Sequence, residues 1–471
     1  MKKTYIYILT CLLGLFVIAS CDDNVDDVAE ITGQDSTEEA IVDDETLEYA
    51  LNGMYDALND QTAFGQYVFV IGDLLSDNAF LSLDNTNRFT TTDDWSWNAT
   101  SGDYVSVWEQ LYDVVAQANI VIEYSDKIEV EDQDVVDDLV GQAYVGRAFA
   151  FYYLAVYFAQ NPNSGIEEDL GIVLSTVYDA NTDQGRSTVS ETWDQIESDL
   201  LDGIDLLDGN GENTKLGTTA ANILLSRVYL ALGEYANSVT YADAALSSST
   251  YSLVDATDYV ASWIDESSSE SVFQLSYTSG DNLTLSGLAS IYDDQGYGDV
   301  LFRENLYNSF SDDDVRKNLL SITDRTIDDP MGYWTSKFPY EAGELSVGEL
   351  DIRLIRMSEA WLNKIEAEYH IDEATALTDL NSFAATRHTV TYASSGSDLL
   401  DDILTERQWE FYGEGMRFND LKRNEMDIEE GTNYISVGTV SYPNDLFVFP
   451  IPQDEIDDNT VLTDDDQNPG Y

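Results

Sequence analysis

The stretch Thr405–Arg423, TERQWEFYGEGMRFNDLKR, combines balanced charge with large apolar side chains and decides how the rest of the chain is interpreted. The whole sequence has 90 acidic and 21 basic residues, whereas acidic and basic side chains balance within this stretch. Because unpaired buried charge is costly, we expect the stretch to be buried with its ions paired. Gly413 and Gly415 flank Glu414 and predict a break between two helical pieces. A structural joint between helices is favoured over a catalytic role.

The net charge restricts the partners and indicates a habitat. The formal charge is −69 and the isoelectric point is near 4.1, so nucleic acid is excluded as a natural partner because its phosphates would be repelled. Acidic residues are spread along the chain, which predicts a solvated surface suited to a halophilic or marine setting where salt screens self-repulsion. A chain of 471 residues can bury a large core.

Residues 1–20 have the pattern of a secretory signal peptide, with a basic start and an apolar run over 5–18. Small residues precede Cys21 as in a bacterial lipobox, which predicts cleavage before Cys21 and lipidation of its thiol; an ordinary signal peptide with an incidental cysteine is the alternative. Residues 21–40 are acidic and short of large apolar residues, so we expect a flexible tether. The other cysteine, Cys11, lies inside the signal, so the mature chain has no disulfide and no thiolate metal site.

Helical periodicity dominates residues 41–471 and predicts one mainly α domain. Helices are expected near 47–58, 107–122, 135–159, 193–207, 220–246, 352–370, 373–388 and 399–424. The piece VYLALGEYANSVTYADAAL, residues 228–246, resembles the central part of a tetratricopeptide repeat, which predicts helix pairs stacked in a superhelical scaffold. Residues 65–106 and 247–348 have weak periodicity and are predicted to be irregular regions presented on one face.

Candidate catalytic and metal-binding groups are few. His370 and His388 are the only histidines, and a structural or surface role is favoured for both over a triad or a metal centre. Among 90 acidic residues, carboxylate pairs of the glycosidase type arise by chance, so no catalytic residue is nominated. Residues 464–468 are similar to the start of a calcium loop, but Pro469 replaces the expected glycine and an EF-hand is rejected. No cofactor is predicted, although so acidic a chain leaves room for a structural calcium ion.

Aromatic side chains on the irregular regions are the strongest candidates for ligand contact. They are Trp95, Trp97, Tyr292, Tyr297 and Trp334. An exposed ring can cover the apolar face of a pyranose while neighbouring polar groups bind its hydroxyls. Core packing is the alternative for each ring taken alone. Because both irregular regions carry such rings, the set as a whole favours a sugar-binding surface.

Six segments together resemble the SusD/RagB family of Bacteroidetes outer-membrane lipoproteins. They are RAFAFYYLAVYF (147–158), TTAANILLSRVYLALGEY (218–235), IRLIRMSEAWLNKIEAE (352–368), the stretch 405–423, FPIPQDEIDDN (449–459) and QNPGY (467–471). The lipobox at Cys21, followed by an acidic run, fits the surface lipoproteins of the same group. The chain departs from the family pattern at AQNPNSGIEEDLG (159–171), which replaces the usual glycine-proline segment.

The resemblance implies an α-helical, tetratricopeptide-like fold, a lipid anchor on the cell surface of the outer membrane, and no catalysis. It also implies a partner, a SusC-like TonB-dependent transporter, and a glycan or in some cases a peptide as ligand. The segment LSDN (75–78) resembles a stretch that contributes polar ligands in the family, which adds Asp77 and Asn78 to the candidate glycan-binding residues.

Three functions remain open at this point. The favoured one is a non-catalytic surface glycan-binding lipoprotein that delivers oligosaccharide or polysaccharide to a transporter. A carboxylate-based glycoside hydrolase or lyase and a pure protein-interaction scaffold are the alternatives, and a peptide-capturing member is a variant of the first. Because an acidic surface repels polyanionic glycans, a neutral glucan such as laminarin is favoured as ligand.

Overall fold

The computed structural model describes residues 40–163, 170–179, 182–322, 331–343, 345–431 and 434–471. The predicted signal peptide (1–20), Cys21 and nearly all of the predicted tether (21–40) lie outside these residues and stay predictions. Within the described part of the chain, no helix is both long enough and apolar enough to cross a membrane.

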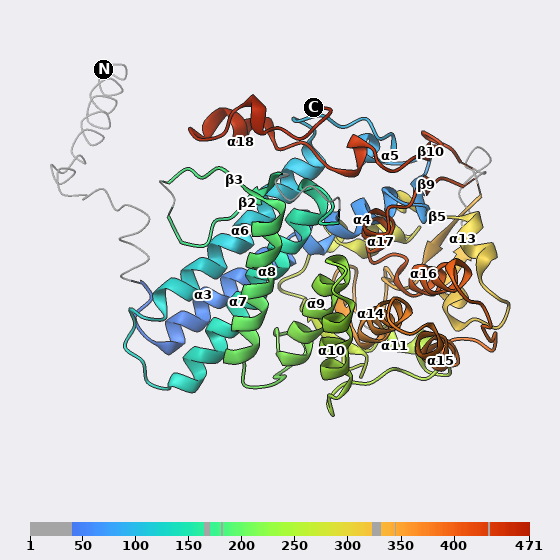
Figure 1. Ribbon diagram of the computed structural model, residues 1–471, viewed down its shortest axis with the longest axis horizontal. Coiled ribbons are helices and arrows are strands. Elements are labelled where there is room, and N and C mark those ends of the chain that lie inside the picture. The colour runs from blue at the N-terminus through green and yellow to red at the C-terminus, as the bar shows by residue number, and fades with distance from the viewer. Residues whose placement is uncertain (1–39, 164–169, 180–181, 323–330, 344, 432–433) are drawn as a thin grey trace, which may run out of the picture.

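Helices form most of the structure and stack largely in sequence order. Figure 1 shows α3 (Asp44–Asn59), α6 (Gly102–Tyr124), α7 (Gln133–Phe158) and α8 (Val189–Leu206) side by side. The stack continues through α9 (Thr218–Ala231), α10 (Tyr235–Leu246), α14 (Met357–Tyr369) and α15 (Glu373–Ala384). The mainly α fold with stacked helix pairs that the sequence predicts is confirmed.

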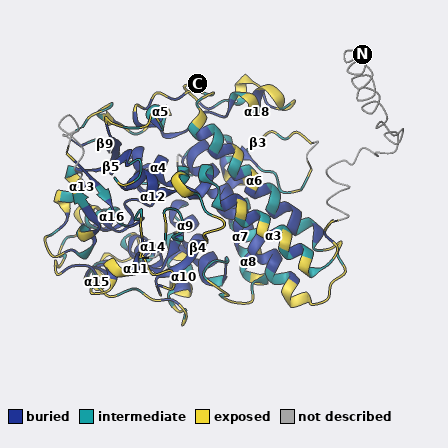
Figure 2. Cartoon of the chain, turned by 180° about the vertical axis from the view of Figure 1, so that it is seen from behind, coloured by how far each residue is buried: buried dark blue, intermediate teal, exposed yellow. Residues whose placement is uncertain are grey.

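The sequence of α7 explains why this helix is central. Every residue from 147 to 158 is buried, and Figure 2 shows that the helices of the stack turn buried faces toward one another. The one charge in this run, Arg147, makes two hydrogen bonds of 2.8 and 2.6 Å to Asp199 of α8.

The helix α8 begins at a capping box: Thr188 Oγ1 accepts from the Glu191 N–H at 3.1 Å, and the Glu191 carboxylate accepts from the Thr188 N–H at 2.9 Å.

A four-stranded antiparallel sheet lies beside the stack, in the order β1 (Ala79–Leu81), β5 (Val300–Arg303), β7 (Gly332–Thr335) and β6 (Leu320–Ile322). One row of paired residues consists of Ala79, Phe302, Tyr333 and Ile322. The next row consists of Phe80, Leu301, Trp334 and Ser321 and, because side chains alternate along a strand, points to the opposite face. Phe302 packs on Tyr412 with ring centroids 5.4 Å apart, so the row of Trp334 faces away from the stretch 405–423.

The remaining elements are short or flank the sheet and the stack. They are α4 (Tyr67–Leu74), α5 (Thr90–Asp93), α11 (Tyr259–Ser262), α12 (Leu288–Tyr292), α13 (Glu304–Ser309), α16 (Ser397–Phe411), α17 (Arg417–Arg423), α18 (Gln453–Asp458), β2 (Leu170–Val173), β3 (Arg186–Thr188), β4 (Ser271–Leu275), β8 (Ile352–Arg356), β9 (Ile428–Glu429) and β10 (Thr439–Val440). The strands β2 and β3, β4 and β8, and β9 and β10 form two-stranded antiparallel pairs.

Two sequence expectations are wrong in part. The regions 65–106 and 247–348 are not irregular throughout, since the first contains α4 and the second contains α11–α13 and β4–β7. The helix α4, YVFVIGDL, is buried around most of its circumference, so it lacks the amphipathic pattern that identifies a surface helix. Residues 352–356 were expected to begin a helix but form β8, because their backbone pairs with β4 before α14 starts.

The stretch 405–423 contains the predicted break. The helix α16 ends at Phe411, α17 begins at Arg417, and Gly413 and Gly415 between them have positive φ angles of 79° and 70°. A Cβ atom on Gly415 would lie 2.8 Å from the Phe69 Cα of α4, so glycine lets the two backbones touch. The turn therefore fixes α4, and with it the start of β1, against the joint.

The charges of the stretch are buried and paired, as predicted. The carboxylate of Glu410 receives Arg387 Nε at 3.0 Å and Arg356 Nη1 at 2.8 Å, and Arg316 Nη1 lies 3.4 Å away. Burial would raise the pKa of Glu410, but these three guanidinium groups hold it well below its usual range. The joint is thus an ionic core that connects α16 to residues from three other segments.

We expect Glu410→Gln to lower the free energy of unfolding by roughly 3–5 kcal/mol, because it leaves three buried guanidinium groups without their shared carboxylate. Urea denaturation followed by circular dichroism measures the change. Asp312→Asn is the matched control. It removes the exposed carboxylate that pairs with Lys317, and the loss of this surface ion pair should change stability little. Equal stabilities of Glu410→Gln and the control would contradict a structural role for the buried network.

Candidate functional site

Three segments with polar and aromatic side chains meet at one end of the four-stranded sheet. The loop 82–89 follows β1, Tyr297 lies just before β5, and Trp334 lies near the end of β7. Because β5 runs antiparallel to both β1 and β7, its beginning lies beside their ends. We call the loop 82–89, Tyr297 and Trp334 together the sheet-end face.

The loop 82–89 is held in place by Asp299. The Ser82 N–H donates to the Asp299 carbonyl at 2.8 Å, the Thr86 N–H donates to Asp299 Oδ1 at 3.1 Å, and the Thr86 hydroxyl donates to Oδ2. Asn87 and Phe89 have positive φ angles of 61° and 54°, which are unfavourable for residues with a Cβ atom. Such backbone strain persists only where the surrounding structure maintains it, and it is concentrated at binding sites.

Arg88 lies between these two strained residues and was missed by the sequence interpretation. Its guanidinium carbon lies 4.1 Å from the centre of the Tyr297 ring. Its Nη1 atom is shielded from solvent and has no hydrogen-bond partner among the described residues. A shielded donor left without an acceptor costs about 1–3 kcal/mol. The signal in the sequence is that Arg88 is the only basic residue between Lys3 and Lys127.

Trp334 keeps part of its ring surface exposed on the outer face of the sheet. It pairs with Ser321 of β6 and belongs to the same row as Leu301. The neighbouring Gly332 leaves no gap, since a Cβ atom there would lie 2.8 Å from the Leu301 Cβ. Trp334 is thus a half-buried ring on a rigid strand, as a ring that binds a ligand requires.

Two predicted ligand residues, Asn78 and Tyr292, instead form an internal hub around Asp73, a buried residue of α4. Asn78 Nδ2 donates to Asp73 Oδ1 at 3.0 Å and Tyr292 OH donates to Asp73 Oδ2 at 3.0 Å. Asp77, which is partly buried, accepts 2.7 and 2.9 Å hydrogen bonds from Arg417 of α17. Asn78 and Tyr292 are fully buried, so the prediction that they contact a ligand is wrong. The sequence shows polar residues in this segment but not that α16 and α17 cover them.

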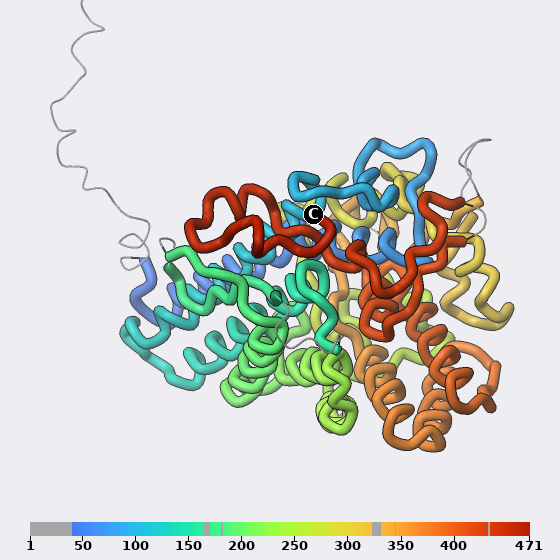
Figure 3. Tube along the Cα trace, turned by 45° about the horizontal axis from the view of Figure 1, so that its top comes forward, coloured from blue at the N-terminus to red at the C-terminus, as the bar shows by residue number. Residues whose placement is uncertain are grey.

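The two tryptophans Trp95 and Trp97 are also buried, which corrects their assignment as exposed sugar-binding rings. Their ring centroids lie 5.4 Å apart, and Trp97 Nε1 donates to the Tyr471 hydroxyl at 2.7 Å. Figure 3 shows the C-terminal segment (red) running beside the segment around residues 90–100 (blue). The polar neighbours in TTDDWSWNAT imitate an exposed setting, whereas the rings are covered by a segment almost 400 residues further along the chain.

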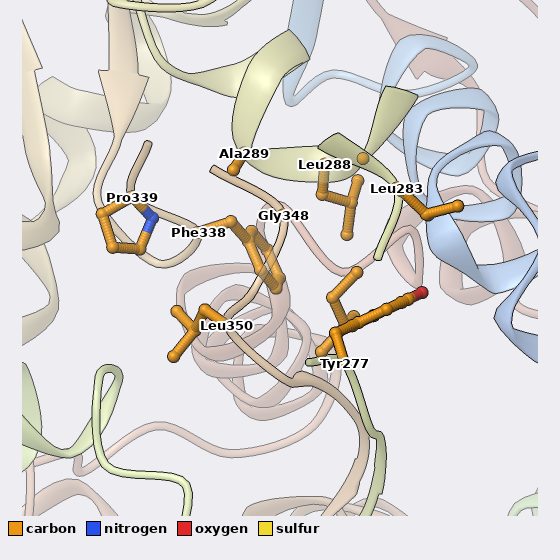
Figure 4. A pocket seen from close by; sticks show the side chains of 10 residues that line it. Tyr277, Leu283, Leu288, Ala289, Phe338, Pro339, Gly348 and Leu350 are labelled. Atoms are coloured by element: carbon orange, nitrogen blue, oxygen red, sulfur yellow. The ribbon is translucent and has the colours of Figure 1, made fainter. Parts of the chain in front are cut away.

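An apolar pocket elsewhere in the molecule includes no residue of the sheet-end face. Figure 4 shows this pocket, lined by Tyr277, Leu283, Leu288 and Phe338, but its free volume is only about 20 Å³, too small for a sugar ring.

Across the described ranges, no group of three or more His, Cys, Asp or Glu side chains is placed to hold a metal ion. His388 is buried with Nε2 2.5 Å from Glu406 Oε1, and His370 stacks on Tyr235 at 3.8 Å between ring centroids.

Comparisons with known proteins point to one family. A model described as "Starch-binding associating with outer membrane" matches residues 27–230, and one described as "SusD family" matches residues 316–471. SusD-like protein P2 of Formosa agariphila is 26% identical over 243 residues, which are 50% of this chain and 44% of that relative, so the chain matches less than half of the relative's length.

Solved structures agree in fold. A SusD superfamily protein from Bacteroides thetaiotaomicron is 27% identical, with a TM-score of 0.84 over 91% of this chain and 100% of that one. Surface glycan-binding protein A from the same organism, in complex with laminarihexaose, is 20% identical, with a TM-score of 0.74 over 91% of this chain and 100% of that one. The second likeness shows the fold alone.

The Asp73 hub generates a prediction about pH. Burial raises the pKa of Asp73 to about 6, although four hydrogen bonds, two of them from Gly413 and Gly415, oppose the shift. Since the folded pKa exceeds the unfolded value of 3.8, the folded state binds the proton more tightly and gains stability as pH falls from about 6 toward 4. Asp73→Asn removes this gain, which is on the order of 2 kcal/mol.

Urea unfolding of wild type and Asp73→Asn at several pH values between 7 and 4 measures the difference. Asp56→Asn, at an exposed position of α3, controls for the change in net charge. Parallel stability profiles for wild type and Asp73→Asn would show that Asp73 does not titrate in this range.

Proposed function

Since the chain belongs to the SusD/RagB family, we propose that it is a non-catalytic surface lipoprotein that binds a glycan and delivers it to a SusC-like TonB-dependent transporter. The sheet-end face carries this proposal. It offers a half-buried tryptophan on a strand and, on a fixed loop, an arginine that stacks on a tyrosine ring but donates no hydrogen bond within the described residues. A flat ring that covers the apolar face of a sugar and a group of hydrogen-bond donors that bind its hydroxyls are the two elements that sugar recognition needs.

A neutral glucan, with laminarin as the example, is the ligand that the charge favours. The formal net charge of −69 opposes the approach of uronate-rich or sulfated chains. A peptide is the second candidate, because the same face could receive backbone carbonyls at Arg88. Hydrolysis or elimination is the weaker alternative, since the two histidines pack against other side chains, His388 at Glu406 and His370 at Tyr235.

The lipid anchor and the outer-membrane location rest on the lipobox pattern that ends at Cys21. Attachment there would leave about 20 residues between the lipid and the folded domain, a flexible span of roughly 25 Å. That span allows the domain to lie directly on a membrane-embedded partner.

Exposed apolar side chains around the sheet support a protein partner. They are Leu83 (57% exposed), Ile322 (56%), Met331 (47%), Ile435 (60%) and Val437 (42%). Tyr434 stacks on Phe80 with centroids 4.9 Å apart and its carbonyl accepts from Arg303 Nη1 at 2.7 Å, so the segment that carries Ile435 and Val437 is held against the outer face of the sheet. Ordered, exposed apolar groups near a binding face are typical of protein interfaces.

Calorimetric titration of the full chain in detergent tests the ligand. The panel contains laminarin oligosaccharides, other neutral glycans, anionic glycans and a peptide mixture, at high salt, with reducing ends assayed in the same samples. We expect saturable binding of a neutral glucan without new reducing ends, and a loss of affinity of about tenfold in Trp334→Ala. New reducing ends would overturn the non-catalytic assignment, and binding of peptides alone would replace the ligand.

The partner is tested with Ile435→Asp, which places a charge in the exposed apolar set. We expect reduced co-purification with the SusC-like transporter from outer membranes, because a buried unpaired carboxylate is costly in an interface. Glycan affinity should stay unchanged. Ile264→Asp is the control, at an apolar position beside α11 that is 50% exposed against 60% for Ile435, and an equal effect of the two variants would argue against an interface at Ile435.

A further inference from the structure

We propose that Arg88, held over the ring of Tyr297, determines the specificity of the sheet-end face by donating paired hydrogen bonds to two neighbouring hydroxyl oxygens of a neutral sugar. In this proposal Tyr297 is a positioning residue and not a platform for the sugar. The inference rests on the proposed glycan binding and adds the group that selects the ligand.

The first observation behind this proposal is how the positively charged side chains are paired. Every other lysine and arginine side chain in the described part of the chain contacts a carboxylate or donates to a backbone carbonyl. Arg88 alone among these described side chains makes neither contact. In a chain with 90 acidic residues a carboxylate partner is easily supplied, so an arginine without one is free to bind something else.

The second observation is the geometry around Arg88. The centre of the tyrosine ring lies 4.1 Å from the guanidinium carbon, so Arg88 covers one face of the Tyr297 ring and closes that face to a sugar. The loop that holds Arg88 is fixed by Asp299, and its flanking residues keep strained φ angles. Contact with an aromatic face orients a planar guanidinium, and because Nη1 is shielded, the Nε–Nη2 edge is the pair of donors left for a ligand.

The surrounding charge selects hydroxyls over a carboxylate or sulfate. Asp84 is exposed in the same loop and Asp299 lies beneath it, so a single guanidinium does not reverse the local sign of the potential. An anionic sugar would gain from Arg88 and lose to its neighbours, whereas a pair of hydroxyl oxygens gains without that cost. The fork of N–H donors matches two adjacent acceptors, which the ammonium of lysine does not.

Four variants of the full chain, titrated with laminarihexaose, test the proposal. We expect Arg88→Ala and Arg88→Lys each to weaken binding by about 10- to 100-fold, the second because it keeps the charge but loses the fork. Tyr297→Ala should weaken binding by about tenfold, and Tyr297→Phe should restore it to within about threefold, because the ring and not the hydroxyl positions Arg88.

Lys127→Ala is the matched control, because Lys127 also lies over a tyrosine ring, 4.2 Å from the centre of Tyr124, and its removal changes the net charge equally. Its affinity should equal that of wild type, and thermal melts of all variants should coincide. Wild-type affinity in Arg88→Ala or in Arg88→Lys would overturn the proposal, as would tighter binding of an anionic oligosaccharide that depends on Arg88. If the wild type binds no glycan, the proposed function itself fails. If the wild type binds a glycan and the Arg88 variants bind it equally well, only the role of Arg88 fails.

Discussion

The structure depends on pairing a small number of cations with buried carboxylates. Glu410 receives three guanidinium groups, Lys337 donates to Glu414 at 2.7 Å, and Arg407 donates to Asp420 at 3.0 Å, all within the joint around α16 and α17. Burial and pairing act in opposite directions on each carboxylate: burial raises the pKa of Glu406, whereas Arg316 and its other partners lower it to about 2. The stretch with the most balanced charge is therefore the place where helices from both halves of the chain meet.

The joint also positions the candidate binding face, although it contributes no residue to it. The turn at Gly415 touches α4, and Asp73 at the end of α4 accepts from that turn, from Asn78 before β1 and from Tyr292. The strand β1 then leads into the loop that presents Arg88. A rigid ionic core and a rigid strand together hold a strained loop in one conformation, which lowers the entropy cost of binding.

The sequence predicts what depends on local pattern and fails where distant segments cover one another. The helix stack, the capping box at Thr188 and the break at Gly413 follow from periodicity and local backbone preference, and the structure has them. Asn78, Trp95 and Tyr292 lie in polar sequence, but residues hundreds of positions away bury them, and no local pattern records that. Arg88 could have been noticed as the only basic residue between Lys3 and Lys127, a signal of charge and not of aromatic content.

The burial of the basic residues has a consequence for resistance to proteolysis. Proteases of the trypsin type cut after lysine or arginine in segments that can enter their cleft in extended form. In the described part of the chain, Lys127 and Lys215 expose 41% and 39% of their side chains, whereas the other basic residues are half-buried or buried, many of them within helices. While it stays folded, the described part of the chain offers such enzymes few places to cut.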